Sequence, residues 1–131
     1  MEKSKEKLDN YLGKLFYAMA IADKKIHSKE IETLNKVLKE KWSASEQNSH
    51  AILSGSQNQI LNTFGQLQKI EADGETCFLE FRVYFIEHPY LFTNEIRNKI
   101  WDTAQLIANS FATKNKSELI LLAKLKTLLK T

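Results

Sequence analysis

Glycine and proline are scarce in this chain, whose 131 residues include four glycines and one proline. Average usage would make these two residue types about 12% of a chain. A sandwich or barrel of short strands needs turn residues about every 8 to 12 positions, so the scarcity counts against an all-β fold. The composition favours a mostly helical domain.

Recognisable catalytic motifs are also missing from the sequence. Cys77 is the single cysteine, so no disulfide can form within the chain, and we expect this residue to be buried as a small apolar side chain. The sequence contains no glycine-rich phosphate loop and no nucleophile-elbow serine. His27, His50 and His88 lack the spacing of a zinc site. We therefore expect a protein that is not an enzyme.

Long apolar runs are absent as well. The uninterrupted apolar run from Leu15 to Ala22 is far shorter than the roughly 20 residues that span a bilayer. Ala18-Met19-Ala20 has the form of a signal-peptidase site, but Glu2, Glu6 and Asp9 precede it, which argues against a signal peptide. We expect a cytoplasmic protein without stable membrane insertion.

The net charge of +3 conceals a division along the chain. Residues 1–41 hold ten basic and seven acidic groups, residues 42–92 hold two and six, and residues 93–131 hold seven and three. Lysine far outnumbers arginine, charges of both signs are interleaved, and no nucleic-acid-binding motif is present. We expect no nucleic-acid partner.

Apolar side chains recur at steps of three and four in the first part of the chain, which predicts two amphipathic helices. The first runs to about Ala22, and its stripe consists of Leu8, Tyr11, Leu12, Leu15, Phe16 and Met19. The second carries Ile31, Leu34, Val37, Leu38 and Trp42. A short charged connection between them predicts a helical hairpin.

Residues 43–68 form a charge-poor segment in which Glu46 is the one charged residue. Ser43 and Glu46 have the spacing of a capping box for a third helical region. The composition is compatible with a flexible surface helix, a helix broken around Gly55, or an interaction face. Because charged residues are depleted in interface cores, we expect this segment to be the contact surface for a partner, with a loosely ordered connector as the alternative.

Residues 76–86 give conflicting indications. Their β-propensity is high, and Asp73-Gly74 before them is typical of a hairpin turn. A strand would need burial on both faces, whereas helical spacing groups Phe78, Phe81 and Phe85 on one face. We therefore favour a helix over residues 75–87.

Two further helices are predicted in the last third of the chain. Pro89 ends the preceding helix, and Thr93 is placed to cap the next one. Asn115 and Glu118 form another capping pair. The leucine-rich face of the terminal helix has the width expected for core packing, although its lysines could lie on an anionic membrane. The sum is a single all-α domain over residues 1–131, a compact bundle of six or seven helices.

The strongest local pattern is Ala20-Ile21-Ala22-Asp23-Lys24-Lys25-Ile26-His27-Ser28-Lys29-Glu30. It resembles the turn between the first two helices of the TerB-like family, named for a tellurite-resistance protein. In that family the pattern recurs near the C-terminus, and residues 107–119 correspond to this second turn. The resemblance implies a bundle with two pseudo-repeated helical hairpins.

The resemblance also implies a function. Acidic residues of the two turns are proposed to bind a divalent cation in the family, which makes Asp23 and Glu30 the candidate metal ligands here. Phe111 stands where the second turn would carry its aspartate, so the resemblance predicts at most a weak divalent cation and no other cofactor. From the residues themselves, Asp23 and Glu30 fit turn and cap roles. We expect a stress-response or adaptor domain that binds another protein; the alternative is a metal-binding protein linked to tellurite resistance.

Overall fold

The structure is a computed structural model that describes residues 2–21, 28–42, 56–109 and 116–130. All regular elements in these residues are helical, which confirms the predicted all-α class. The helices are α1 (Glu2–Ala20), α2 (Ser28–Val37), α3 (Ser56–Lys69), α4 (Gly74–Glu87), α5 (Asn94–Asn109) and α6 (Lys116–Leu129). A π-helical turn continues α2 over Leu38–Trp42, and a 3-10 turn over Pro89–Leu91 joins α4 to α5.

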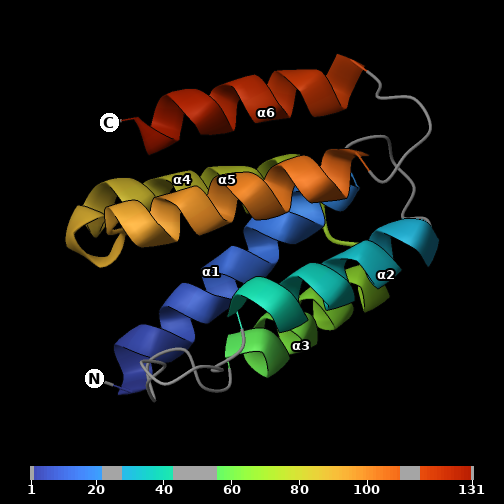
Figure 1. Cartoon of the computed structure of the whole chain (residues 1–131), viewed down its shortest axis with the longest axis horizontal. Coiled ribbons are helices and arrows are strands. Elements are labelled where there is room, and N and C mark those ends of the chain that lie inside the picture. Colours follow the sequence, from blue (N-terminus) through green and yellow to red (C-terminus); the bar gives the residue numbers. More distant parts are fainter. Residues whose placement is uncertain (1, 22–27, 43–55, 110–115, 131) are drawn as a thin grey trace.

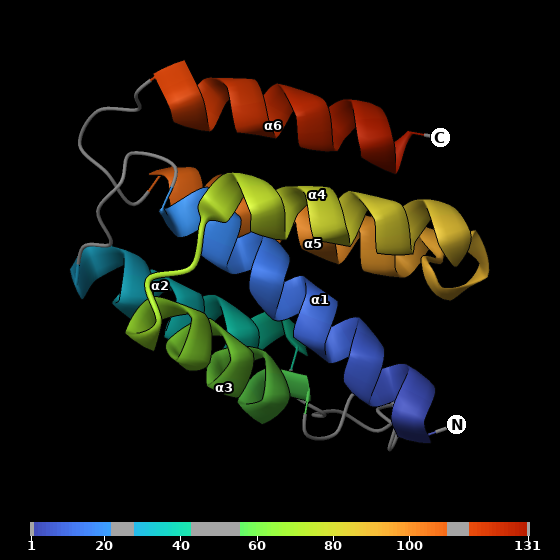
Figure 2. The same cartoon turned by 180° about the vertical axis from the view of Figure 1, so that it is seen from behind.

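Helix α1 is the centre of the bundle. It lies between α2 and α3 on one side and α4 and α5 on the other, while α6 forms the outer edge next to α4 and α5 (Figures 1 and 2). Its second half is buried on every side, and the residues with at most 1% exposure are Leu12, Leu15, Phe16, Tyr17, Ala18, Met19 and Ala20. A helix that is apolar all round can be stable only if other helices cover it completely.

The first two helices pack differently from the expected hairpin. Among the described residues, α1 packs mainly against α3 and α4, whereas α2 packs against α5. The pairing follows the apolar faces: Leu34 and Leu38 of the second helix and its π-helical turn are buried in the common core. The predicted pairing of consecutive helices is therefore not the main contact in this bundle.

Residues 76–86 are helical, as the spacing of their phenylalanines predicts. The buried face of α4 carries Cys77, Phe78, Phe81, Tyr84 and Phe85. Asp73 is the N-cap, because its carboxylate accepts hydrogen bonds from the backbone N–H and the hydroxyl of Thr76 at 2.9 and 2.8 Å. The Asp73-Gly74 pair therefore begins a helix here and does not form a hairpin turn.

Two predictions for the last third of the chain are confirmed. The Thr93 hydroxyl accepts the backbone N–H of Ile96 at 3.3 Å and caps α5. The terminal helix packs on the core through Leu122, Leu125 and Leu128, which are buried. The predicted capping pairs Ser43–Glu46 and Asn115–Glu118 lie outside the residues and side chains that the structure describes. None of the described helices has the length and apolar character needed to cross a bilayer.

Candidate functional site

The turn that carries the predicted metal ligands is mostly outside the described residues. Asp23 and His27 lie in the range 22–27, and Glu30 lies in the first turn of α2 with its side chain undescribed. Within the described ranges, no three His, Cys, Asp or Glu side chains are grouped so that they could hold a metal ion. The cation site at Asp23 and Glu30 stays a prediction.

His88 is described, and its surroundings are structural. Its ring Nδ1 lies 3.1 Å from the Tyr84 carbonyl oxygen, and its ring packs on the Tyr84 ring with 4.4 Å between centroids. Its backbone N–H bonds to the same carbonyl, so the residue forms the C-cap of α4. These contacts give His88 a structural role at the end of α4.

An open groove with a mostly apolar lining lies between α4 and α6. We call it the α4–α6 groove; its volume is about 640 Å³. The α4 wall is formed by Phe78, Leu79, Arg82, Phe85 and Ile86, with Glu75 and Pro89 at its two ends, and the α6 wall by Ala123, Lys124, Thr127 and Leu128. Phe78, Phe85 and Leu128 are nearly buried and form its floor. The two helices lie next to each other in Figure 2.

Helix α4 also carries a row of exposed apolar side chains next to this groove. Leu79, Val83 and Ile86 are 49%, 53% and 55% exposed, and we call these three residues the α4 stripe. Their spacing of four and three residues places them on one face of the helix. Two of the three also line the groove, so the stripe and the groove form one continuous apolar surface.

The charges around this surface are unevenly paired. On one edge of α4, Glu80 forms an ion pair with Lys14 of α1 at 3.0 Å. On the groove side, Arg82 of α4 and Lys124 of α6 form no ion pair or hydrogen bond within the described residues. The groove therefore has an apolar floor, one cation on each wall that lacks a partner among the described residues, and one carboxylate, Glu75, at the N-terminal end of the α4 wall.

Arg97 of α5 holds the walls of the groove in place. Its Nη1 donates to the Leu129 carbonyl at 2.8 Å, at the end of α6, and its Nε donates to the Phe92 carbonyl at 2.8 Å. The guanidinium also lies 4.9 Å from the centre of the Phe85 ring on α4. One side chain thus contacts α4, α6 and the segment before α5, and it fixes the distance between the two walls.

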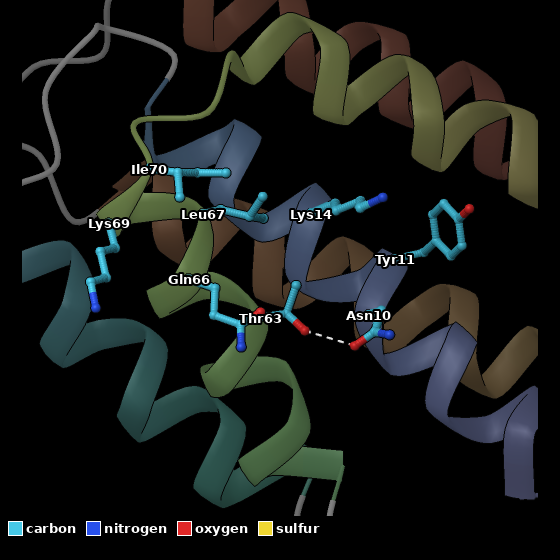
Figure 3. A pocket seen from close by; sticks show the side chains of 8 residues that line it. All are labelled: Asn10, Tyr11, Lys14, Thr63, Gln66, Leu67, Lys69 and Ile70. Atoms are coloured by element: carbon cyan, nitrogen blue, oxygen red, sulfur yellow. Dashed lines mark hydrogen bonds between the residues drawn. The ribbon is translucent and has the colours of Figure 1, made fainter.

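A second cleft lies between α1 and α3 (Figure 3) and has a volume of about 610 Å³. Three of its polar side chains, Asn10, Lys14 and Thr63, have partners. The Asn10 Oδ1 accepts hydrogen bonds from Thr63 and Gln59, both at 2.8 Å, and Lys14 lies 4.6 Å from the centre of the Tyr11 ring besides pairing with Glu80. These contacts join α1 to α3 and α4, whereas the Gln66 and Lys69 side chains on the α3 side form no hydrogen bond or ion pair within the described residues.

The single thiol is poorly placed for nucleophilic chemistry. Cys77 is 3% exposed, as expected from the sequence. Burial raises the pKa of the Cys77 thiol above its ordinary value, and the nearby charge of Glu80 adds to this effect. A thiol with a raised pKa stays protonated at neutral pH, and the protonated form is not the nucleophile.

Comparisons of the chain with protein-family models, with curated proteins and with solved structures find no match. A functional proposal therefore depends on the residues and their geometry. Periodicity did not predict the α4–α6 groove, although Leu79, Val83 and Ile86 have the spacing of one helix face in the sequence.

Proposed function

We propose that this chain is a non-enzymatic adaptor module that binds another protein, and that the partner docks on the α4 stripe and the α4–α6 groove. The observation that carries the proposal is the row of three half-exposed apolar side chains that continues into the groove. Contiguous apolar surface of this kind marks interaction sites on soluble proteins. A groove between two helices is a common receptor for peptide segments.

This docking surface differs from the one expected over residues 43–68. The described part of that segment is α3, whose Ile60 and Phe64 are buried in the common core. Its outward positions include Asn62, Gly65 and Gln66, which offer no apolar anchor. Residues 56–68 are thus an amphipathic helix packed on α1, while residues 43–55 lie outside the described residues.

The TerB-like resemblance of residues 20–30 supports the same class of function. It would place the module in a cytoplasmic stress response, including resistance to tellurite. The divalent-cation alternative has its own test. Because hard cations need several oxygen ligands, we expect calorimetry to show no submillimolar binding of calcium or magnesium; such binding, abolished by Asp23→Asn, would favour the metal-binding function over the adaptor.

The adaptor proposal can be tested by site-specific photo-crosslinking. We would place a photoreactive amino acid at Val83 in the α4 stripe and, as a control, at Asn62, which is also exposed and lies on α3. In the native host, the stripe position is expected to give a discrete adduct that the control position does not give. The adduct protein is then purified and its affinity for the unmodified chain is measured.

The decisive comparison uses two matched variants. Val83→Asp is expected to lower the affinity for the purified partner at least tenfold, because a charge would be buried in the interface. Asn62→Asp is expected to leave the affinity unchanged. Crosslinking at Asn62 alone, or equal binding by both variants, would contradict docking on the α4 stripe.

A further inference from the structure

We infer that the docked element is an amphipathic helix. Its apolar face, which we call the seam, is flanked by acidic side chains, and Arg82 and Lys124 select for those carboxylates. This inference rests on the proposed docking surface. It adds the shape and the charge of the partner segment, which the proposed function leaves open.

The shape of the surface fits a helix better than a narrow chain. The groove and the α4 stripe lie side by side, so an occupant of the groove alone would leave Val83 uncovered. A single acyl chain is too narrow to cover both, whereas a helix with its side chains is about 10–12 Å wide. From Glu75 to Pro89, which both line the groove, the wall is about 20 Å long at the helical rise per residue, or nearly four turns.

The charge of the surface indicates what borders the seam of that helix. Arg82 and Lys124 stand on opposite walls, and neither has a partner within the described residues. Glu75 is the one carboxylate among the described residues that line the groove, so the charge of the lining is net positive. Charged side chains outside the groove do form ion pairs: Glu80 pairs with Lys14, and Glu95 pairs with Lys99. A helix lying in the groove would place its edge positions against both cations, where acidic side chains gain hydrogen bonds and basic ones are repelled.

A second copy of this chain fits the surface less well. Closed dimers use the same patch on both subunits, related by a two-fold axis. An axis through the groove would bring Arg82 and Lys124 against the same two cations of the other copy. Two α4 carboxylates bear on this repulsion. Glu80 lies on the opposite edge and is already paired, and Glu75, which lines the groove, offsets only one of the two cations of each copy. The observations therefore favour a different protein over self-association.

The test is a selection of displayed peptides against the full-length chain. The library consists of amphipathic helices of about four turns, with seam positions varied among apolar residues and edge positions varied among Glu, Lys and Ser. We expect enriched peptides to carry Glu at the edge positions. Replacing these glutamates with lysine is expected to weaken binding about tenfold, since two exposed ion pairs at the rim are lost.

Charge exchange on the protein distinguishes selection from coincidence. In the double variant Arg82→Glu with Lys124→Glu, the same library is expected to enrich Lys at the edges. The control for the α6 substitution is Lys126→Glu, which makes the same Lys-to-Glu change on α6 at a position that does not line the groove, and it is expected to keep the preference for Glu.

Each outcome has a defined meaning. Peptides whose binding is lost in Val83→Asp but which show no edge preference would overturn this inference and leave the adaptor proposal standing. A library that yields no groove-dependent peptide would overturn both. Saturable binding of palmitate in place of peptides would also overturn both, as would concentration-dependent dimers in sedimentation that Val83→Asp dissolves.

Discussion

At the scale of single residues, Gly13 sets how closely α1 and α3 can approach. A Cβ atom at this position would lie 2.7 Å from the Thr63 Cβ and 3.1 Å from the Ile60 carbonyl oxygen. Neither atom belongs to the end of a flexible side chain, so neither can move aside without moving the helix. The glycine therefore permits the helix contact that also forms the hydrogen bond between Thr63 and Asn10.

We predict that Gly13→Ala destabilises the protein even though alanine is the better helix former. Overpacking costs about 1–3 kcal/mol, which exceeds the propensity gain of up to about 1 kcal/mol. Gly65→Ala is the matched control, because Gly65 is also helical but a Cβ there has no atom within 4 Å. We expect the control to be stabilised by about 0.5–1 kcal/mol. Urea unfolding measures both; equal effects would contradict the close approach.

Glu71 occupies a position at the end of α3 that favours glycine. Its φ is 53°, and the bonds from Ala72 N–H to the Leu67 carbonyl and from Glu71 N–H to the Gln68 carbonyl form a Schellman motif. A left-handed conformation costs a side-chain-bearing residue about 1 kcal/mol. We predict that Glu71→Gly raises the free energy of unfolding by up to about 1 kcal/mol, whereas Glu71→Ala does not. A stability gain in both variants would instead indicate relief of charge repulsion.

At the scale of elements, the start of α4 depends on the charge of Asp73. Hydrogen bonds from the Thr76 side chain and then from the Thr76 backbone hold the pKa of the Asp73 carboxyl below its ordinary value of 3.8. A pKa that is lower in the folded state gives stability that is present above the unfolded value and is lost as pH falls through the folded value.

We therefore predict that Asp73→Ala lowers the melting temperature at neutral pH and that the difference from the wild type shrinks as the solution becomes strongly acidic. Asp73→Asn is the matched control. Asparagine caps a helix about as well as aspartate but does not titrate, so this variant is expected to remain near wild-type stability at neutral pH. Thermal unfolding followed by circular dichroism over a pH series measures both. A pH-independent difference for Asp73→Ala would contradict the charged cap.

The attachment of α6 depends on Arg97. We predict that Arg97→Gln destabilises the protein by about 2 kcal/mol, since it removes charge-assisted hydrogen bonds to two main-chain carbonyls. Hydrogen exchange is expected to accelerate mainly in α6, where the Leu129 carbonyl loses its donor. Arg82→Gln is the control, because Arg82 is exposed and has no partner within the described residues. Equal destabilisation by both variants would contradict the role of Arg97.

Elements were more predictable from the sequence than their arrangement. The spacing of Phe78, Phe81 and Phe85 correctly predicts α4, and Thr93 correctly predicts the start of α5. The close contact at Gly13 and the α4–α6 groove depend on which helices become neighbours, and periodicity within one helix carries no such information. The docking surface was therefore expected in the charge-poor segment, because low charge was the only indication of an interface that the composition offered.

At the scale of the whole molecule, burial differs between the central and the outer helices. Helix α1 is enclosed by its neighbours, and Phe16 is completely buried in the common core. Helix α6 lies at the outer edge and attaches through one buried face, in which Leu125 is also completely buried (Figure 1). Removing either of these two side chains is therefore expected to have different effects. Local stability depends on the cooperative unit to which a residue belongs, and the two residues belong to different parts of the bundle.

We predict one cooperative unfolding transition for the wild type, as expected for a single domain of this size. Phe16→Ala is expected to lower the free energy of unfolding by about 3–5 kcal/mol and to accelerate hydrogen exchange in all helices, because its cavity weakens contacts on every side of α1.

Leu125→Ala is expected to accelerate exchange mainly in α6 and in the groove-facing part of α4, while α1 and α3 keep their protection. Because the α4–α6 groove requires both walls, Leu125→Ala is also expected to weaken a docked helix without altering the α4 stripe itself. Uniform acceleration in both variants would show that α6 unfolds only together with the whole bundle, and the groove would then be a rigid part of the fold.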